Sequence, residues 1–360
     1  MDGILFSLLA IALFIFVLGA IVLVHELGHY LSARAFDVRV LEFGFGFPPR
    51  AKVLRSKGET LLTLNWLPIG GFVRMDGEDG DESDARSFSA KPLWVRLTIL
   101  VAGVAMNVVL AFVIFFMIAW LATPTVGATV DTVEPASPAA QIGLVSGDEL
   151  YAINGARVDM FSGNAFPDVL RSHAGETIGL GVRHADGSES VLYVTLRPKD
   201  QLATNRGALG VHLGKQTYAY VGHSPGEAVG IAGTSVVHWG GLIVSGLGQL
   251  VDGFIKDPTA QPPAAGPIGI AVSLADVLLG VGPLILLFIA GVLSINLAVV
   301  NILPFPPLDG GRMVMLIVKR LFGERVSLRA ERLTYAVGFV FLMAFVIWIS
   351  GFDIANLANR

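Results

Sequence analysis

Long apolar runs alternate with polar segments along this chain. The first run, Ile4–Val24, has about 21 residues and would be ~31 Å long as an α-helix, which matches the thickness of a hydrocarbon core. A cleavable secretory signal has basic residues before its apolar run, and none precedes this one, so we interpret it as a retained membrane span. Three further runs, of which the last is short, bring the predicted number of transmembrane helices to four: Leu97–Leu121, Val277–Leu303 and Thr334–Ile349.

The segment after the first span reads as β-structure. Ala51–Leu54 and Thr60–Trp66 flank a turn at Ser56–Glu59, which predicts a β-hairpin. Its side chains are too apolar for an ordinary loop, so we expect the hairpin to dip into the membrane. Its edge could pair with an extended substrate strand, or the hairpin could serve in packing alone.

Between the second and third spans, residues 126 to 198 combine short apolar runs with closely spaced turns. Gly143-Leu144, Gly147-Asp148 and Asn154-Gly155 fall in an order that resembles a PDZ domain, a fold that binds an extended peptide by strand addition. Further on, Gly226–Phe254 is Gly- and Ser-rich and moderately apolar. We interpret it as an amphipathic helix on the membrane surface, with His238 as an interfacial side chain rather than a ligand.

These segments predict a polytopic α-helical membrane protein with a membrane-associated β-hairpin and an inserted PDZ-like β-rich domain. The expected organisation is two spans with the hairpin in residues 1–121, the PDZ-like domain in 122–200, a linker and surface helix in 201–276, and two spans in 277–360.

Charge then sets the expected orientation. Basic residues gather between the first and second spans, from Arg34 to Arg96, and after the third span, from Arg312 to Arg332. By the positive-inside rule both loops are cytoplasmic, while both termini and the PDZ-like domain are extracytoplasmic. Overall, 53% of the 360 residues are hydrophobic and 15% are charged, and the net charge of −4 argues against a nucleic-acid partner.

The candidate chemistry lies at the cytoplasmic end of the first span, where His25-Glu26-Leu27-Gly28-His29 follows the apolar run. Two histidines four residues apart share one helix face and can reach one metal ion, and Glu26 between them can accept a proton from water. Ionisable groups at this depth are costly and therefore indicate a functional site. The chain has no cysteine, so a metal here must be held by His, Asp or Glu.

A zinc hydrolase usually has three protein ligands, so a third is needed. Asp309 follows the third span, after the extended segment that Pro304, Pro306 and Pro307 enforce. It could cap the following helix. As a carboxylate on the same side as His25, it is the better candidate for the third ligand.

Together the His25-Glu26-x-x-His29 motif, the stretch from Asn301 through Pro304 and Pro306 to Asp309-Gly310, and the PDZ-like segment resemble the site-2 protease family of intramembrane metalloproteases, most closely its bacterial RseP-like branch. The resemblance implies Zn²⁺ on His25, His29 and Asp309, with Glu26 as general base. It also implies that Asn301, Pro304 and Pro306 hold the substrate and that the hairpin adds the substrate as a strand.

Two departures from the pattern are visible. The chain has one PDZ-like segment where the RseP-like branch has two, and Val104 follows Gly103 where many relatives have proline, which leaves a role for Asn107 as a secondary expectation.

The expected function is regulated intramembrane proteolysis in the bacterial cytoplasmic membrane, with the active site toward the cytoplasm. The expected partners are a single-span membrane substrate of the anti-sigma-factor type, the lipid bilayer, and a peptide or C-terminus at the PDZ-like domain. Two alternatives stay open: an inactive membrane scaffold, and a membrane-anchored zinc peptidase that acts on soluble peptides.

Overall fold

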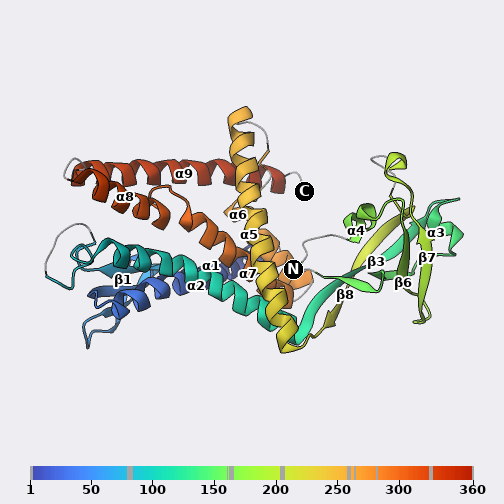
Figure 1. The fold of residues 1–360 in the computed structure, drawn as a ribbon, viewed down its shortest axis with the longest axis horizontal. Coiled ribbons are helices and arrows are strands. Elements are labelled where there is room, and N and C mark those ends of the chain that lie inside the picture. Colours follow the sequence, from blue (N-terminus) through green and yellow to red (C-terminus); the bar gives the residue numbers. More distant parts are fainter. Residues whose placement is uncertain are drawn as a thin grey trace. The chain divides into compact units, whose positions relative to one another are not determined.

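The computed structural model divides the chain into two compact units, one formed by residues 1–114 with 236–360 and the other by residues 115–235 (Figure 1). Each is described by itself. The structure describes residues 3–78, 84–159, 161, 166–202, 207–257, 261–262, 265–280, 283–323 and 327–358.

Apolar helices dominate the chain outside the β-rich unit. Five helices in the described ranges are long and apolar enough to cross a membrane, one more than the sequence pattern predicted, because α5 joins α1, α2, α7 and α9. The helices are α1 (Gly3–Ala35), α2 (Leu93–Ala122), α5 (Pro225–Lys256), α6 (Pro267–Gly280), α7 (Pro283–Ile302), α8 (Asp309–Phe322) and α9 (Leu328–Ala358).

Two predicted spans differ in extent from the observed helices. The run Val277–Leu303 covers the end of α6 and all of α7, and α7 begins at Pro283, where a residue without a backbone N–H fits a helix start. The run Thr334–Ile349 was too short, because α9 has 31 residues and continues through polar positions.

Asp353 explains why α9 can continue past the apolar run. Its carboxylate is buried and accepts hydrogen bonds from the backbone N–H groups of Gly266 at 3.0 Å and Gly269 at 2.9 Å. These groups belong to the start of α6, where a helix leaves backbone donors unpaired and favours negative charge. The carboxylate therefore joins the end of α9 to the beginning of α6.

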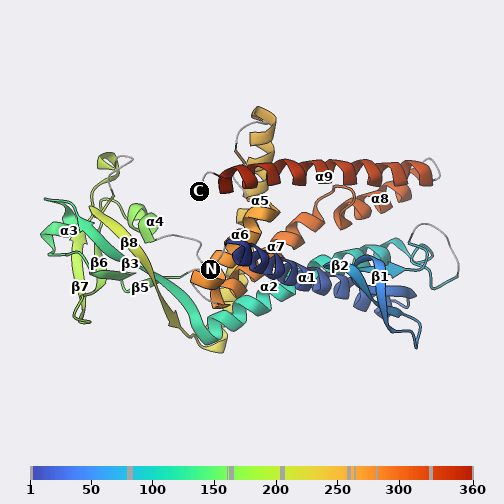
Figure 2. The same cartoon turned by 180° about the vertical axis from the view of Figure 1, so that it is seen from behind.

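The predicted hairpin is present but longer than expected. β1 (Val40–Arg55) and β2 (Leu61–Met75) are antiparallel, and each bends so that its two halves find different neighbours. The first half of β1 pairs on one side with Leu61–Leu67 and on the other with Gly71–Met75, so the two bent strands form four antiparallel segments that lie side by side. Gly71–Met75 lies against α1, which places β-structure beside the His25 motif (Figure 2).

A buried carboxylate fixes this hairpin. Glu42 accepts hydrogen bonds from Nε and Nη2 of Arg50, at 3.2 and 2.7 Å, and from Oγ1 of Thr63 at 2.8 Å. Several large apolar side chains of the hairpin are instead exposed, including Leu54 and Trp66, the latter 71% exposed. An exposed apolar patch of this kind is typical of a surface that contacts lipid.

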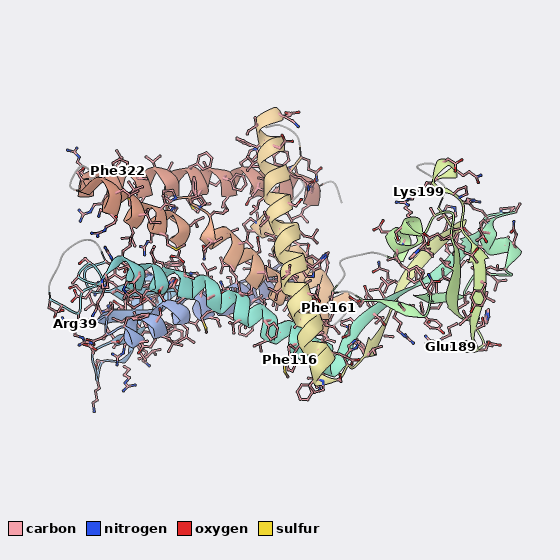
Figure 3. All side chains as sticks on the ribbon, in the orientation of Figure 1. Arg39, Phe116, Phe161, Glu189, Lys199 and Phe322 are labelled. Carbon is pink, nitrogen blue, oxygen red and sulfur yellow. The ribbon has the colours of Figure 1, made fainter. Side chains whose placement is uncertain are left out.

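Charged groups tie the hairpin turn to the end of α1. Glu59 accepts hydrogen bonds from Arg34 at 2.9 Å and from Arg86. Arg39, which is labelled in Figure 3, lies near the same carboxylate. The hydrogen bond from Arg86 lowers the pKa of Glu59. Because these groups are exposed, the network orients the hairpin more than it stabilises the fold.

The second unit contains a six-stranded antiparallel sheet in the order β7-β6-β4-β5-β3-β8. Its apolar core includes Leu150, Ile178 and Leu180, all fully buried. The elements are β3 (Thr123–Val133), α3 (Pro138–Gln141), β4 (Glu149–Ile153), β5 (Ala156–Asp159), α4 (Phe166–Ser172), β6 (Thr177–Arg183), β7 (Glu189–Thr195), the 3₁₀ helix η2 (Lys199–Gln201) and β8 (Val211–Val221).

The last strand of this sheet lies beyond the predicted domain. β8 falls in the segment 201–276 that we had assigned to a linker and surface helix, yet it pairs with β3 from Thr123↔Val221 to Val133↔Val211. This long-range pairing could not be read from local pattern, because β8 is separated from its partner by most of the unit.

Candidate metal centre

Two histidines of α1 face the interior of the unit formed by residues 1–114 and 236–360, which we call the membrane unit. His25 and His29 are one helical turn apart and are 4% and 6% exposed. Their rings meet edge to face, with centroids 4.7 Å apart. The helix continues without interruption from the apolar run through both residues, so the i, i+4 spacing does place both imidazoles on one face, as the sequence predicted.

Asp309 reaches these histidines from the far end of the sequence. It is the first residue of α8, seven residues after α7 ends at Ile302. A side chain at Gly310 or Gly311 would collide with the backbone of residues 302 to 306, so the chain can fold this tightly only with glycine at both positions. The turn carries the carboxylate back toward α1.

The three side chains form a compact cluster. Oδ2 of Asp309 lies 2.9 Å from Nε2 of His25 and 3.2 Å from Nε2 of His29, and the two Nε2 atoms are 3.1 Å apart. Ligands about 2.0–2.1 Å from one tetrahedral ion are separated by about 3.3 Å. The structure therefore brings together the three residues that the sequence suggested as ligands.

The donor set fits zinc. Two imidazoles and one carboxylate are the ligands of many catalytic zinc sites, and such sites leave a fourth position open. Nδ1 of His29 lies 2.8 Å from the carbonyl oxygen of Ile99, which fixes the proton on Nδ1 and leaves Nε2 free to bind a metal. Among the described residues, His25, His29 and Asp309 form the group whose ligand atoms lie close enough together, within 4.8 Å of one another, to hold one metal ion.

Glu26 borders a small cavity beside the cluster. The cavity, about 60 Å³, is also lined by His29 and Asp309, and by Val73 and Met75 of β2. It is large enough for a water molecule. A carboxylate that is not among the clustered ligand atoms but faces the same cavity can take a proton from water held there.

Close packing of α2 against α1 forms the wall behind the histidines. A Cβ at Gly103 would collide with both imidazole rings, and one at Gly28 would collide with the backbone of Ala102. The helices approach this closely because both positions lack a side chain. Sequence reasoning noted Gly103 as part of a pattern but did not identify its role, because the role depends on which helix faces α1.

The other expected residues lie at different distances from the cluster. The amide nitrogen of Asn301 is 3.4 Å from Nε2 of His25, and that of Asn107 is 3.3 Å from Nδ1 of the same ring. Pro304 and Pro306 lie in the connection between α7 and α8, where the backbone of Pro306 is in close contact with Gly338 of α9.

Two charged residues that the sequence analysis did not select also reach the cavity. Glu78 follows β2 and accepts hydrogen bonds from Arg312 and from the backbone N–H of Met75 at 3.2 Å. Both charged side chains line the cavity that contains Glu26. The position of Arg312, three residues after Asp309, was the available signal.

Comparison with known proteins gives a consistent result. Peptidase family M50 matches residues 13–345. Zinc metalloprotease RasP of Geobacillus kaustophilus is 28% identical, over 97% of this chain and 98% of the relative. A putative zinc metalloprotease of Clostridium perfringens is 30% identical, over 98% of both chains. The regulator of sigma-W protease RasP of Bacillus subtilis is 26% identical, over 96% of this chain and 98% of the relative.

The apolar helices, the cluster and the zinc metalloprotease relatives together identify this multi-pass membrane protein as a metalloprotease whose metal is zinc. The chain belongs to Peptidase family M50, the site-2 protease family.

The contact between Gly103 and the two rings gives a direct test of the centre. Gly103→Ala would insert a methyl group where the imidazoles lie, and overpacking of this kind costs about 1–3 kcal/mol. We expect the variant to lose bound zinc during purification while the protein still inserts, as measured by metal analysis. Gly351→Ala on α9 is the matched control, because its added methyl group meets open space. Full zinc content in Gly103→Ala would contradict the described packing.

Proposed function

We propose that this protein cleaves a peptide bond inside or beside the membrane-spanning segment of a single-span membrane protein. The observation that carries the proposal is the proximity of the His25–His29–Asp309 cluster, Glu26 and the strand Gly71–Met75. A zinc ion in such a site acts as a Lewis acid toward a carbonyl group and lowers the pKa of coordinated water to about 7.

In this proposal the residues of the chain have separate tasks. His25, His29 and Asp309 hold the metal, and Glu26 accepts a proton from the attacking water and passes it to the leaving amine. Asn301, whose amide reaches the cluster, holds the substrate together with the extended segment that contains Pro304 and Pro306.

The hairpin supplies what a helical substrate lacks once it is unwound. An unwound segment exposes backbone N–H and C=O groups that must be paired in an apolar environment. Gly71–Met75 runs along α1 next to Glu26, with Val73 and Met75 facing the cavity. An extended substrate aligned with this strand would have its backbone within reach of both the sheet and the metal centre.

The substrate class follows from one relative. The Bacillus subtilis protein is named a regulator of sigma-W protease, and in view of that name we propose that this chain cleaves an anti-sigma factor. An inactive scaffold is the weaker alternative because the three candidate ligands are clustered and Glu26 lines the adjoining cavity. A peptidase for soluble peptides is disfavoured because the cluster is buried among apolar helices.

We further propose that the catalytic end of the membrane unit faces the cytoplasm, in a bacterial inner membrane. The basic loops support this orientation. A cavity lined by Arg96 at the start of α2 and by Tyr335 near the start of α9 lies at the end that carries these loops. Both helices lead away from it in the same general direction (Figure 1).

The path of α5 bears on whether this helix crosses the membrane. Just before α5, the N–H of His223 donates to the carbonyl of Ala119 at 3.1 Å, near the end of α2. Near the other end of α5, the ring of Phe254 packs edge to face against Trp348 of α9, with centroids 5.2 Å apart. Both ends of α5 thus connect to helix ends remote from the basic loops. This supports a surface helix, four crossings and extracytoplasmic termini.

For the second unit we propose a role in substrate selection. β8 is an edge strand of the sheet, and a groove of about 440 Å³ lies between β8 and α4. Leu170 and Arg171 of α4 line one side, and residues 207–213 line the other. An extended peptide could add to the free edge of β8, with its C-terminal carboxylate near the backbone of residues 208–210. The unit could also exclude substrates by size.

The catalytic assignment is tested by Glu26→Gln. Loss of the general base should reduce cleavage of a single-span substrate by about 10²–10⁴-fold, while bound zinc stays at the wild-type level because the ligands remain. His25→Ala and Asp309→Asn should instead reduce bound zinc. Reconstituted protein, a fluorescent substrate and metal analysis provide the two readouts. Wild-type turnover by Glu26→Gln would rule the mechanism out.

Topology is testable with single cysteines, since the chain has none. Ser56→Cys in the hairpin turn should react with a membrane-impermeant maleimide only after the membrane is opened. Ala185→Cys, in the exposed turn between β6 and β7, and Lys256→Cys, at the end of α5, should react in intact spheroplasts. Protection of Lys256→Cys alongside labelling of Ala185→Cys would mean that α5 crosses the membrane.

The role of the second unit requires boundaries that respect the sheet. Thr123 and Val221 are paired, so a short linker can replace residues 123–221 without separating α2 from α5. We expect this variant to bind zinc and to cleave a minimal substrate, and to cut untrimmed substrates that the full chain rejects. Loss of minimal-substrate cleavage in an inserted, zinc-bound variant would assign the unit to catalysis instead.

Point variants separate peptide binding from size exclusion. Arg171→Glu changes the charge of the groove wall, whereas Lys199→Glu makes the same change on η2, outside the groove (Figure 3). Weaker binding of peptides with a free C-terminus in Arg171→Glu alone would favour the groove. Equal binding in both variants would favour exclusion by size.

A further inference from the structure

Asn107 of α2 is a fully buried polar side chain in contact with the metal cluster. Its amide nitrogen lies 3.3 Å from Nδ1 of His25. Its carbonyl oxygen Oδ1 has no hydrogen-bond partner among the described residues. An unpaired buried carbonyl oxygen costs free energy, and buried polar groups of this kind call for a specific explanation.

The explanation lies in the two nitrogens of His25. Nε2 faces Asp309 and His29, so it is the nitrogen that can bind a metal ion, and Nδ1 faces Asn107. A neutral imidazole carries one proton. When Nε2 binds a metal, the proton must be on Nδ1, and that N–H needs an acceptor.

His29 shows how the second histidine solves the same problem. Its Nδ1 lies 2.8 Å from the carbonyl oxygen of Ile99, a backbone acceptor that cannot turn. Among the described residues, Asn107 is the side chain that lies within hydrogen-bond distance of Nδ1 of His25. A half-turn of the amide about its own axis would bring Oδ1 to the place of the nitrogen, without any movement of α2.

We propose that Asn107 is a positioning residue for His25, an inference that rests on the proposed zinc site. With a metal on Nε2, Asn107 accepts a hydrogen bond from Nδ1–H and holds the ring in its ligating orientation. Without a metal, the same amide donates to Nδ1 while Nε2–H donates to Asp309. An amide serves both tautomers because it offers a donor and an acceptor at nearly equal positions.

Two neighbours define the surroundings of Asn107. The hydroxyl of Ser294 on α7 donates to the backbone carbonyl of Asn107 at 2.8 Å. Gly103, one turn earlier on the same face of α2, provides the space in which the imidazoles lie. The face of α2 that contacts the histidines therefore carries Gly103, which makes room for the rings, and Asn107, which bonds to one of them.

The experiment compares zinc affinity in four full-length variants, measured in detergent by competition with a chelator. Asn107→Leu removes the acceptor at similar volume and should weaken zinc binding by about 10–100-fold, the range found when an outer hydrogen bond to a ligand is lost. Asn107→Asp keeps an oxygen acceptor and should bind zinc within about threefold of wild type. Asn107→Ala should behave like Asn107→Leu and serves if leucine prevents folding.

Ser294→Ala is the matched control, because it removes a buried hydrogen bond to the same residue but leaves the side-chain amide in place. We expect it to bind zinc like wild type. The visible spectrum of the Co²⁺-substituted protein provides a second readout, which should change in Asn107→Leu and remain near wild type in Asn107→Asp. A merely structural role for Asn107 would make a buried aspartate at least as harmful as leucine.

The outcomes separate this inference from the proposed function. Wild-type affinity in Asn107→Leu, or equal loss in Asn107→Leu and Asn107→Asp, would overturn the positioning role even if His25→Ala abolishes zinc binding. If His25→Ala binds zinc like wild type, the zinc site itself is wrong. If the affinities follow the expected order but Glu26→Gln still cleaves substrate, the positioning role stands and the proposed mechanism fails.

Discussion

The close approach of α1 and α2 at Gly28 and Gly103 is the constraint on which the rest of the membrane unit depends. Two glycines let the helix backbones come near enough for the imidazoles of α1 to pack directly against α2. That contact supplies the carbonyl oxygen of Ile99 to His29 and the amide of Asn107 to His25. A wider spacing would leave both histidines without outer partners, and their rings would be free to rotate away from a common centre.

The same physical rule governs the other polar groups of this unit. In an apolar environment each buried charge needs fixed partners. Glu42 satisfies its carboxylate with Arg50 and Thr63, and Asp353 does so with the backbone of α6. Asp353 connects helices that are distant in sequence, and Glu42 joins the two strands of the hairpin, so each buried carboxylate also fixes which segments lie side by side.

Sequence alone predicted the parts of the site that local spacing determines. His25, Glu26 and His29 follow from helical periodicity, and Asp309 from the need for a third ligand at matching depth. Features that depend on long-range pairing were not predicted. These include the second partner of β1, the strand β8 in a segment read as a linker, and the extension of α9 beyond Ile349. In each case the local pattern is weak and the stabilising partner lies far along the chain.

The role of Asn107 illustrates a further limit of reading a sequence. Asparagine in an apolar span signals a functional position, but the signal does not say which atom of the side chain is used. The structure narrows this to two atoms, since the nitrogen faces His25 and the oxygen lacks a partner among the described residues. A side chain that is half satisfied beside a ligand is what a ring with two tautomers requires. Its one unmet bond is therefore best explained by the chemistry of its neighbour rather than by poor packing.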